Sequence, residues 1–254
     1  PFGFPPSLLH SLKDPRNPHY FNLLKGALLY SDILTTVSPS YAEEIQKKAF
    51  GLAPSFVTHK DKLTGILNGI ETNYWNPQTD PHLKENYPPS PDQLQQVFEG
   101  KKANRKELSK RLNLKESAAP LVSSVTRLVK QKGPDLIYFA INDILEKGGQ
   151  FVLLGSSPEK AIQKQFDSLK RKYRNNPNVH FRFEFNEPLA HLIFAASDMT
   201  LIPSLFEPCG LTQLIALRYG TLPLAHKVGG LKDTVFEGKN GYTFDAPKTC
   251  LLYT

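Results

Sequence analysis

The stretch SLFEPCGLTQ, residues 204–213, sets the carboxylate of Glu207 just ahead of a predicted helix and just after an apolar run that predicts a buried strand. The first backbone N–H groups of such a helix, at Gly210, Leu211 and Thr212, suit a phosphate. A carboxylate there is a poor phosphate ligand but a good acceptor for the hydroxyls of a group attached to the phosphate, such as a sugar. Capping of the helix by Glu207 is the alternative, and these residues alone leave both open.

Two cations lie in a second predicted loop, within SSVTRLVKQKGPDL. Arg127 and Lys132 follow the strand expected at 119–126 and precede a helix, so they should reach the same edge of the sheet as Glu207. Two cations converging there would neutralise a diphosphate and assist its departure. A solvated loop is the competing interpretation.

The other candidates are weaker. Asn68 and Gly69, between apolar residues, indicate either a tight turn or a site. Cys209 precedes a helix start, which could lower the pKa of its thiol, but no histidine shares its loop, and a small packing residue is the favoured interpretation. Neither Cys209 nor Cys250 has the spacing of a disulfide framework or a zinc site, so no disulfide and no metal are predicted.

From residue 118 onward, apolar runs alternate with amphipathic segments. Strands are predicted over 119–126, 150–155, 178–185, 198–203 and 221–225, and helices over 134–148, 157–173, 187–197 and 210–220. We expect Ser157 to cap the second of these helices with Pro158 at its first position, and Gly148 and Gly220 to follow helix ends. Repeated strand-helix-strand units predict an α/β fold with a doubly wound parallel sheet, which binds ligands beyond the carboxyl ends of its strands.

The first hundred residues follow another pattern. Residues 21–50 predict a helix, a strand and a second helix, which starts at Ser38–Pro39 or at Ser40 with Glu43. Residues 73–100 are rich in turns and lack the periodicity of a core, so they predict an extended linker. We therefore expect two domains, 1–100 and 101–254.

The composition limits the classes of partner that we expect for this protein. The chain has 254 residues and a formal charge of +7, and no apolar run or leader that would indicate a membrane span or a signal peptide. A soluble intracellular protein without a membrane partner is expected. Much of the basic excess lies in 101–115 and 160–176, which we interpret as solvated helix faces. No aromatic stripe interleaves these charges, so no nucleic acid partner is predicted.

Five blocks together resemble the family of bacterial glycogen synthases and plant starch synthases, which are retaining glycosyltransferases of the GT-B fold. The blocks are LLKGALLYSDILTTVSPSYAEEI, GILNGIETNYWNP, SSVTRLVKQKGPDLI, IPSLFEPCGLTQLIALRYGTLP and VGGLKDTVFEGKNGYTFD, in family order between residue 20 and about residue 245. The resemblance implies transfer of glucose from ADP-glucose to the non-reducing end of an α-1,4-glucan, glycogen or starch, without a cofactor. It also implies the cytoplasm if the source is bacterial, or a plastid if it is a plant or alga.

The resemblance also implies roles for the candidate residues. Arg127 and Lys132 become the diphosphate clamp, and Glu207 the residue that holds the donor glucose. The implied substrate-binding residues are Asn68 in an interdomain cleft, Phe185 against the adenine, Gly210, Leu211 and Thr212 at the distal phosphate, and Cys209 beside them in the sequence. Phe185 stands where the family often has a tyrosine, so the hydroxyl is missing. Ile215 stands where broader GT-B relatives carry a second glutamate, and this departure is typical of the synthase branch.

Some family features have no counterpart in the sequence. The N-terminal lysine-glycine-glycine motif and the histidine near the anomeric centre are not found, and the sequence ends where the family continues with further helices. We therefore expect a fragment, comprising the end of the N-terminal domain and most of the C-terminal one, that does not synthesise glucan alone. A non-catalytic nucleotide- or glucan-binding module is the alternative function. A dinucleotide-binding dehydrogenase is disfavoured, because no Gly-x-Gly-x-x-Gly follows the strand at 119–126.

Overall fold

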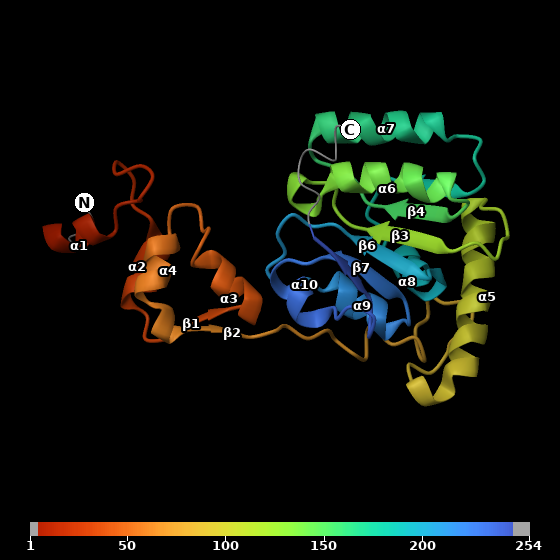
Figure 1. Ribbon diagram of the computed structural model, residues 1–254, viewed down its shortest axis with the longest axis horizontal. Helices are drawn as coiled ribbons and strands as arrows, with labels where there is room; N and C mark the ends of the chain where they lie inside the picture. Colours follow the sequence, from red (N-terminus) through yellow and green to blue (C-terminus); the bar gives the residue numbers. More distant parts are fainter. Residues whose placement is uncertain (1–4, 246–254) are drawn as a thin grey trace. The chain divides into compact units, whose positions relative to one another are not determined.

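The computed structural model describes residues 5–245, and its contacts divide the chain into two compact units, Pro1–Asn68 and Gly69–Thr254. Figure 1 colours the two units in sequence order. Cys250 lies outside the described residues, so its sequence-based interpretation stays a prediction.

The first unit combines short helices with a small parallel sheet. Its elements are α1 (Pro6–Ser11), α2 (Leu23–Tyr30), β1 (Leu34–Thr36), α3 (Pro39–Ile45), α4 (Ala53–Thr58), the 3₁₀ turn η1 (Lys60–Lys62) and β2 (Leu63–Gly65). Strands β1 and β2 pair in parallel. The Oγ of Ser38 accepts a hydrogen bond from the Tyr41 N–H at 3.2 Å, and Pro39 is the first residue of α3. The first of the two predicted starts for this helix is therefore confirmed.

The second unit is built on one six-stranded parallel sheet in the order β5-β4-β3-β6-β7-β8. Its strands are β3 (Leu121–Val125), β4 (Gln150–Leu154), β5 (Val179–Arg182), β6 (Met199–Ile202), β7 (Leu222–His226) and β8 (Tyr242–Phe244). Its helices are α5 (Leu94–Leu112), α6 (Pro134–Glu146), α7 (Lys160–Lys172), α8 (Glu187–Ala196), α9 (Thr212–Arg218) and α10 (Gly229–Thr234), with 3₁₀ turns η2 (Pro91–Gln93) and η3 (Lys130–Lys132). The predicted α/β class with a doubly wound parallel sheet is confirmed.

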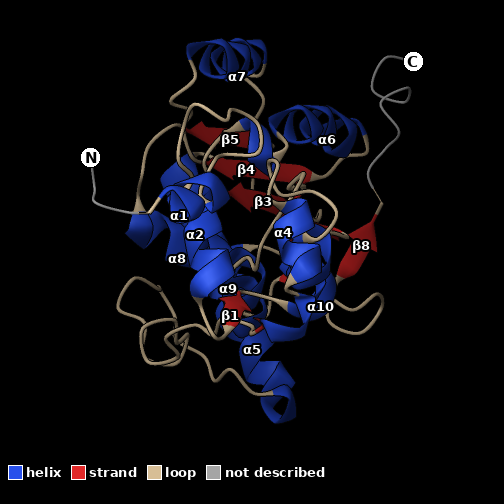
Figure 2. Cartoon of the chain, turned by 90° about the vertical axis from the view of Figure 1, so that its left-hand side faces the viewer, coloured by secondary structure: helices blue, strands red, loops and turns tan. Residues whose placement is uncertain are grey.

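Helices cover the centre of this sheet on both faces, with α6 and α7 on one side of β3 and β4 and α8 on the other (Figures 1 and 2). Strand β4 shows how burial on both faces determines the residue types of a strand. Phe151 and Leu153 pack in the core cluster that contains α6 and α7, whereas Val152 and Leu154 pack in the cluster that contains α8 and α9. A strand buried on both faces is apolar throughout, as the run in β4 is.

The helix ends agree only in part with the sequence-based predictions. Gly148 and Gly220 have positive φ, +80° and +66°, just after α6 and α9, as predicted. The prediction that Ser157 caps α7 is wrong, because that helix begins at Lys160. The Oγ of Ser157 instead accepts from the Glu159 N–H at 3.1 Å, which closes a turn ahead of the helix.

Residues 73–100, for which the sequence predicts a linker, belong to the second unit, and from Leu94 onward they form the start of α5. Asp80 Oδ2 lies 2.7 Å from His191 Nδ1 and accepts a hydrogen bond from the Tyr219 hydroxyl at 2.5 Å. The Trp75 ring stacks on His191, with ring centroids 4.1 Å apart. Tyr87 is also buried and donates to the carbonyl of Tyr219. These anchors are polar and aromatic and follow no strand or helix period, which is why the sequence pattern does not reveal a core.

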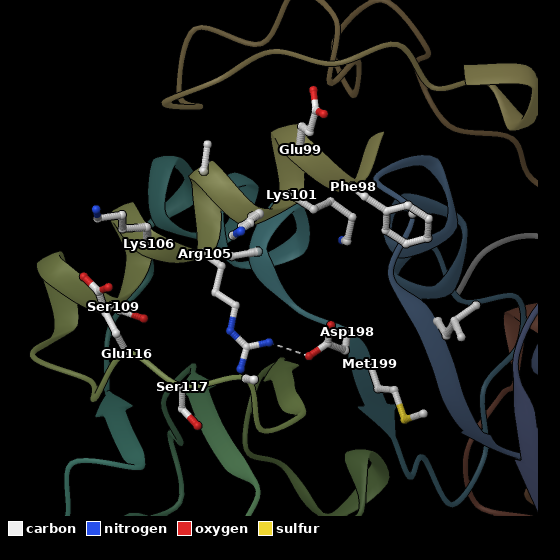
Figure 3. A pocket seen from close by; sticks show the side chains of 16 residues that line it. Phe98, Glu99, Lys101, Arg105, Lys106, Ser109, Glu116, Ser117, Asp198 and Met199 are labelled. Carbon is white, nitrogen blue, oxygen red and sulfur yellow. Dashed lines mark hydrogen bonds and ion pairs between the residues drawn. The ribbon is translucent and has the colours of Figure 1, made fainter. Parts of the chain in front are cut away.

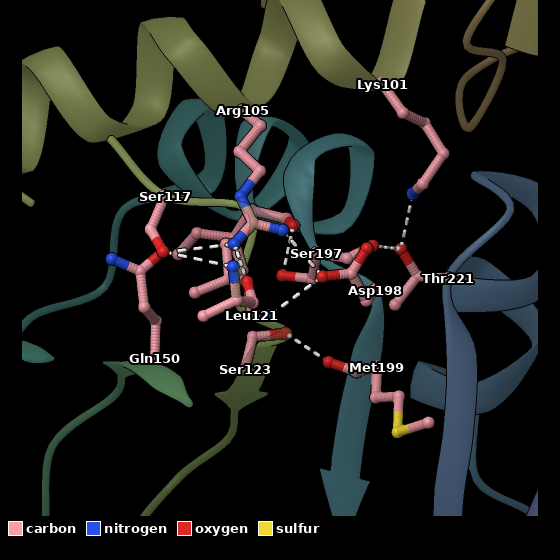
Figure 4. A network of polar contacts seen from close by, with 12 residues as sticks. Lys101, Arg105, Ser117, Leu121, Ser123, Gln150, Ser197, Asp198, Met199 and Thr221 are labelled. Atoms are coloured by element: carbon pink, nitrogen blue, oxygen red, sulfur yellow. Dashed lines mark hydrogen bonds and ion pairs between the residues drawn. The ribbon is translucent and has the colours of Figure 1, made fainter. Parts of the chain in front are cut away.

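Helix α5 is tied to the amino-terminal edge of the sheet by polar contacts (Figure 4). Lys101 Nζ donates to Thr221 Oγ1 at 2.9 Å and to the carbonyl oxygen of Tyr219 at 3.1 Å. Arg105 pairs with Asp198 at 2.6 Å, and the same Asp198 oxygen accepts from the Leu121 N–H at 2.7 Å. This helix therefore joins the start of β3 to the end of α9.

Candidate functional site

The strand order reverses between β3 and β6. From β3 the chain continues to β4 and β5 on one side, and then returns to β6, β7 and β8 on the other. All neighbouring strands are parallel, so the loops after β3 and β6 leave the sheet at the same edge. Such a switch point is where doubly wound sheets bind their ligands.

Hydrogen bonds join these two loops directly. The Leu205 N–H donates to the Gln131 carbonyl at 2.8 Å, and Gln131 Nε2 donates to the Phe206 carbonyl at 3.2 Å. Gly133 has φ +64°, and a Cβ there would lie 2.2 Å from the Pro203 carbonyl oxygen. Only glycine allows this approach without strain. The sequence therefore fixes the two loops against each other.

The two loops bring Lys132 and Glu207 together, as the sequence predicted. Lys132 Nζ lies 2.5 Å from Glu207 Oε2, and the Ser204 hydroxyl donates to the same oxygen at 2.8 Å. Glu207 is only 6% exposed. Its other oxygen, Oε1, has no hydrogen-bond partner within residues 5–245 and is not sealed from solvent. The carboxylate thus has one oxygen held by the protein and one acceptor to offer.

The main chain of Glu207 is held by the start of α10, the helix that follows β7. The Gly230 N–H donates to the Glu207 carbonyl at 2.9 Å. Gly229 has φ +45°, and a Cβ at this position would lie 2.0 Å from the same carbonyl oxygen. The segments that follow β3, β6 and β7 therefore converge on this one residue.

Capping does not explain Glu207. The N-cap position of α9 is Leu211, which makes no side-chain capping bond, and the Glu207 carboxylate is bound by the side chains of Lys132 and Ser204. The structure favours a role for Glu207 between the loops over the helix-capping alternative.

The residues that follow Glu207 are tightly packed. Cys209 is buried, and its carbonyl accepts from Gln213 Nε2 at 3.1 Å, which favours the packing interpretation of this cysteine. Gly210 adopts φ +76°, and helix α9 begins at Thr212. The N–H groups of Gly210, Leu211 and Thr212 thus lie at the start of a short helix, as predicted, a few residues after Glu207.

The remaining candidates are not brought into contact with this pair. Arg127 is exposed on the loop after β3, and its side chain makes no hydrogen bond or ion pair within residues 5–245. Phe185, 90% exposed, follows β5, two strands away from β3. Asn68 ends the first unit, is exposed, and lies in an irregular segment, so the tight turn considered for it is not formed.

Three supporting residues were missed by sequence reasoning: Ser204, Gln131 and His226. Ser204 lies three residues before Glu207, so its proximity was a usable signal. The contacts of Gln131 and His226 depend on the order and register of strands, which a single sequence does not supply.

A large cavity lies elsewhere. A groove of about 1040 Å³ runs between α5 and the beginnings of β6 and β7, at the edge of the sheet opposite the site (Figure 3). Arg105 at its centre is already paired with Asp198 (Figures 3 and 4). Volume alone does not make this groove the functional site, because the unpaired acceptor and the nearby cations lie at the carboxyl edge.

The described residues contain neither a group of metal-binding side chains nor a helix that could span a membrane. Residues 5–245 contain no cluster of three or more histidine, cysteine, aspartate or glutamate side chains able to hold a metal ion. Within that range, no helix combines the length and apolarity that crossing a membrane requires.

The second unit is thus a doubly wound α/β domain with a cation and an acid at its switch point, the place where such sheets bind their ligands. Residues 104–249 match the family described as Glycosyl transferases group 1, and residues 1–57 match the Starch synthase catalytic domain. The chain therefore belongs to the group 1 glycosyltransferases and, within them, to the glycogen and starch synthase family, as the motifs predicted.

Several curated relatives of the chain are glycogen or starch synthases. The chain is 46% identical to a glycogen synthase of Protochlamydia amoebophila over 93% of its own length and 50% of the relative. It is 47% identical to glycogen synthase 2 of Methylococcus capsulatus, covering 92% of the chain and 49% of the relative. The chain thus spans about half the length of these curated relatives.

A solved structure supports the fold. The catalytic domain of starch synthase IV from Arabidopsis thaliana, bound to ADP and acarbose, is 42% identical with a TM-score of 0.90. The match covers 98% of this chain and 53% of that one. The predicted GT-B-type fold is confirmed.

Proposed function

We propose that the chain carries the donor site of a retaining glucosyltransferase that transfers glucose from ADP-glucose to the non-reducing end of an α-1,4-glucan. The observation that carries the proposal is the Lys132–Glu207 pair at the switch point, with the second carboxylate oxygen of Glu207 left open. Membership of the glycogen and starch synthase family supports the same assignment.

Lys132 is proposed to bind the diphosphate. Its ammonium group has three N–H donors, and Glu207 occupies one of them, so two remain for phosphate oxygens. Arg127 adds a second cation from the same loop, and the backbone N–H groups of 210–212 add neutral donors. The starch synthase IV structure supports a nucleotide diphosphate, because that protein was solved with ADP.

Glu207 is proposed to hold the donor glucose. Its Oε1 can accept hydrogen bonds from sugar hydroxyls while Oε2 stays fixed by Lys132 and Ser204. Phe185 is proposed to contact adenine, and Asn68 the sugar. Cys209 shapes the loop through packing, and we assign it no chemical step.

The chemistry follows from these positions. As the bond between the glucose C1 and the diphosphate oxygen breaks, negative charge grows on the departing ADP. Lys132 and Arg127 stabilise that charge, which is the role a metal ion has in other transferases. The glucan hydroxyl attacks from the face that ADP leaves and gives its proton to the departing diphosphate oxygen, so the configuration at C1 is retained. We propose glycogen or starch as the acceptor, and cytoplasm or plastid as the compartment according to the source.

Calorimetric titration of the purified chain with ADP tests the diphosphate assignment. Lys132→Ala should weaken ADP binding roughly ten- to 150-fold, since one charge-assisted contact is worth about 1.5–3 kcal/mol. Lys130→Ala is the matched control, because this exposed lysine lies in the same turn, η3, and carries the same charge. Equal affinities of the two variants for ADP would refute the assignment of Lys132.

A further inference from the structure

His226, the last residue of β7, lies directly behind the loop that carries Glu207. Its Nδ1 is 2.7 Å from the carbonyl oxygen of Ser204. A carbonyl only accepts hydrogen bonds, so Nδ1 must carry the proton and donate. The imidazole is 5% exposed and stacks on Phe244 of the neighbouring strand β8, with ring planes 17° apart. Both the plane and the donor atom of this ring are therefore fixed.

Ser204, which accepts a hydrogen bond from His226, also donates one to the carboxylate of Glu207. Ser204 is almost fully buried, and its hydroxyl donates to Glu207 Oε2 at 2.8 Å. A hydrogen bond to the Ser204 carbonyl restrains the peptide next to its Cα, and hence the position of its hydroxyl. The contacts form a chain from His226 through Ser204 to Glu207.

The same segment restrains Glu207 a second time. Gly230, four residues after His226, donates its N–H to the Glu207 carbonyl. The end of β7 and the start of α10 thus hold the loop after β6 at two points, the carbonyl of Ser204 and the carbonyl of Glu207. Lys132 approaches Oε2 from the loop after β3. With Oε2 bound by Lys132 and Ser204, Oε1 is the oxygen that remains free to accept a hydrogen bond.

We propose that His226 is a positioning residue that holds Ser204 so that Glu207 presents Oε1 to the donor sugar. The assignment rests on the proposed function for the identity of the ligand. The N–H at Nδ1 of His226, and not the charge or the volume of the imidazole, orients the carboxylate of Glu207.

Two variants separate these properties. His226→Phe keeps the ring and its stacking on Phe244 but removes the N–H. His226→Asn removes the ring but keeps an amide N–H close to the position of Nδ1. The first readout needs no ligand: amide hydrogen exchange of residues 204–210 in the free chain should be faster in His226→Phe and close to wild type in His226→Asn.

The second readout is the ratio of the affinities for ADP-glucose and ADP, measured by calorimetry. His226→Phe should lower this ratio about three- to tenfold, the value of one neutral hydrogen bond, while the affinity for ADP alone stays within about twofold. His226→Asn should restore the ratio, a rescue that a general packing role would not produce.

The outcomes are distinct. Wild-type exchange of 204–210 in His226→Phe, or equal behaviour of the two variants, would overturn the positioning role. Failure of the wild-type chain to bind ADP or ADP-glucose would instead refute the proposed function, while the exchange experiment would still test the contact chain. If His226→Phe does not fold, an Asn variant with slow exchange and a normal ratio supports the proposal, and an Asn variant that lacks both contradicts it.

Discussion

The carboxylate of Glu207 is almost fully buried, and burial of a charge costs free energy unless partners compensate for it. Lys132 and Ser204 supply that compensation at a single oxygen. The sequence predicted the meeting of Lys132 and Glu207, because the carboxyl ends of parallel neighbouring strands share one edge. It did not predict Ser204 or His226, whose roles depend on distances between loops and strands.

Glu207→Gln tests whether Glu207 binds the sugar while other groups bind the diphosphate. The amide keeps the shape of the side chain but removes the charge and half of its acceptor capacity. We expect the affinity for ADP to stay within a few-fold, since Lys132 keeps its donors, and the added affinity for ADP-glucose to be lost. Titration with both ligands makes the comparison. A large loss of ADP affinity with the sugar contribution intact would contradict the proposed contact.

At the scale of elements, the sequence predicted the helices and strands with a clear hydrophobic pattern and missed the segments without one. Strands β3, β4, β6 and β7 were predicted from largely apolar runs bounded by turn residues, and β5 from the alternation of apolar and polar residues in VHFR. Strand β8 has three residues, and α10 has six and opens with two glycines, so neither gives a clear pattern. Within the predicted linker, 73–100, the sequence did not reveal the contacts of Asp80 and Trp75, because these are long-range and polar or aromatic.

The contacts of α5 make stability depend on pH. Burial lowers the pKa of Lys101 to about 7, whereas its ordinary value is 10.5. Between these values the unfolded chain binds more protons at this site than the folded one, so the free energy of unfolding should rise as pH rises through that window. The penalty is fully present below about pH 7 and disappears above about pH 10.5.

Lys101→Met should remove this dependence. The stability of the wild type relative to the variant should increase between pH 7.5 and 9.5, by up to about 1.4 kcal/mol per pH unit for one proton. Urea unfolding at the two pH values measures the difference, and Lys102→Met, at an exposed neighbouring position, is the control. The same difference at both pH values would show that Lys101 does not titrate in this window.

At the scale of the whole molecule, the candidate donor groups divide unevenly between the two units. Lys132, Glu207 and the start of α9 all belong to Gly69–Thr254, whereas Asn68 belongs to Pro1–Asn68. The core of the second unit is formed by its own sheet and helices. The ADP-binding groups should therefore not require the first unit.

A chain of residues 69–254 should fold and bind ADP with an affinity within about threefold of the 254-residue chain. Circular dichroism and the urea midpoint would establish folding, and calorimetry the affinity. If Asn68 contacts the sugar, the shortened chain should lose affinity for ADP-glucose but not for ADP. A folded 69–254 chain without affinity for ADP would show that the first unit supplies essential diphosphate contacts.

The central claim is that the loops after β3 and β6 form the donor site, and a crystal structure of the chain with ADP-glucose tests it most directly. We expect a phosphate oxygen at a hydrogen-bond distance of about 2.7–3.2 Å from Lys132 Nζ, and a glucose hydroxyl at a similar distance from Glu207 Oε1. Donor bound at another place, or at this edge with its phosphates and glucose beyond the reach of Lys132 and Glu207, would contradict the account.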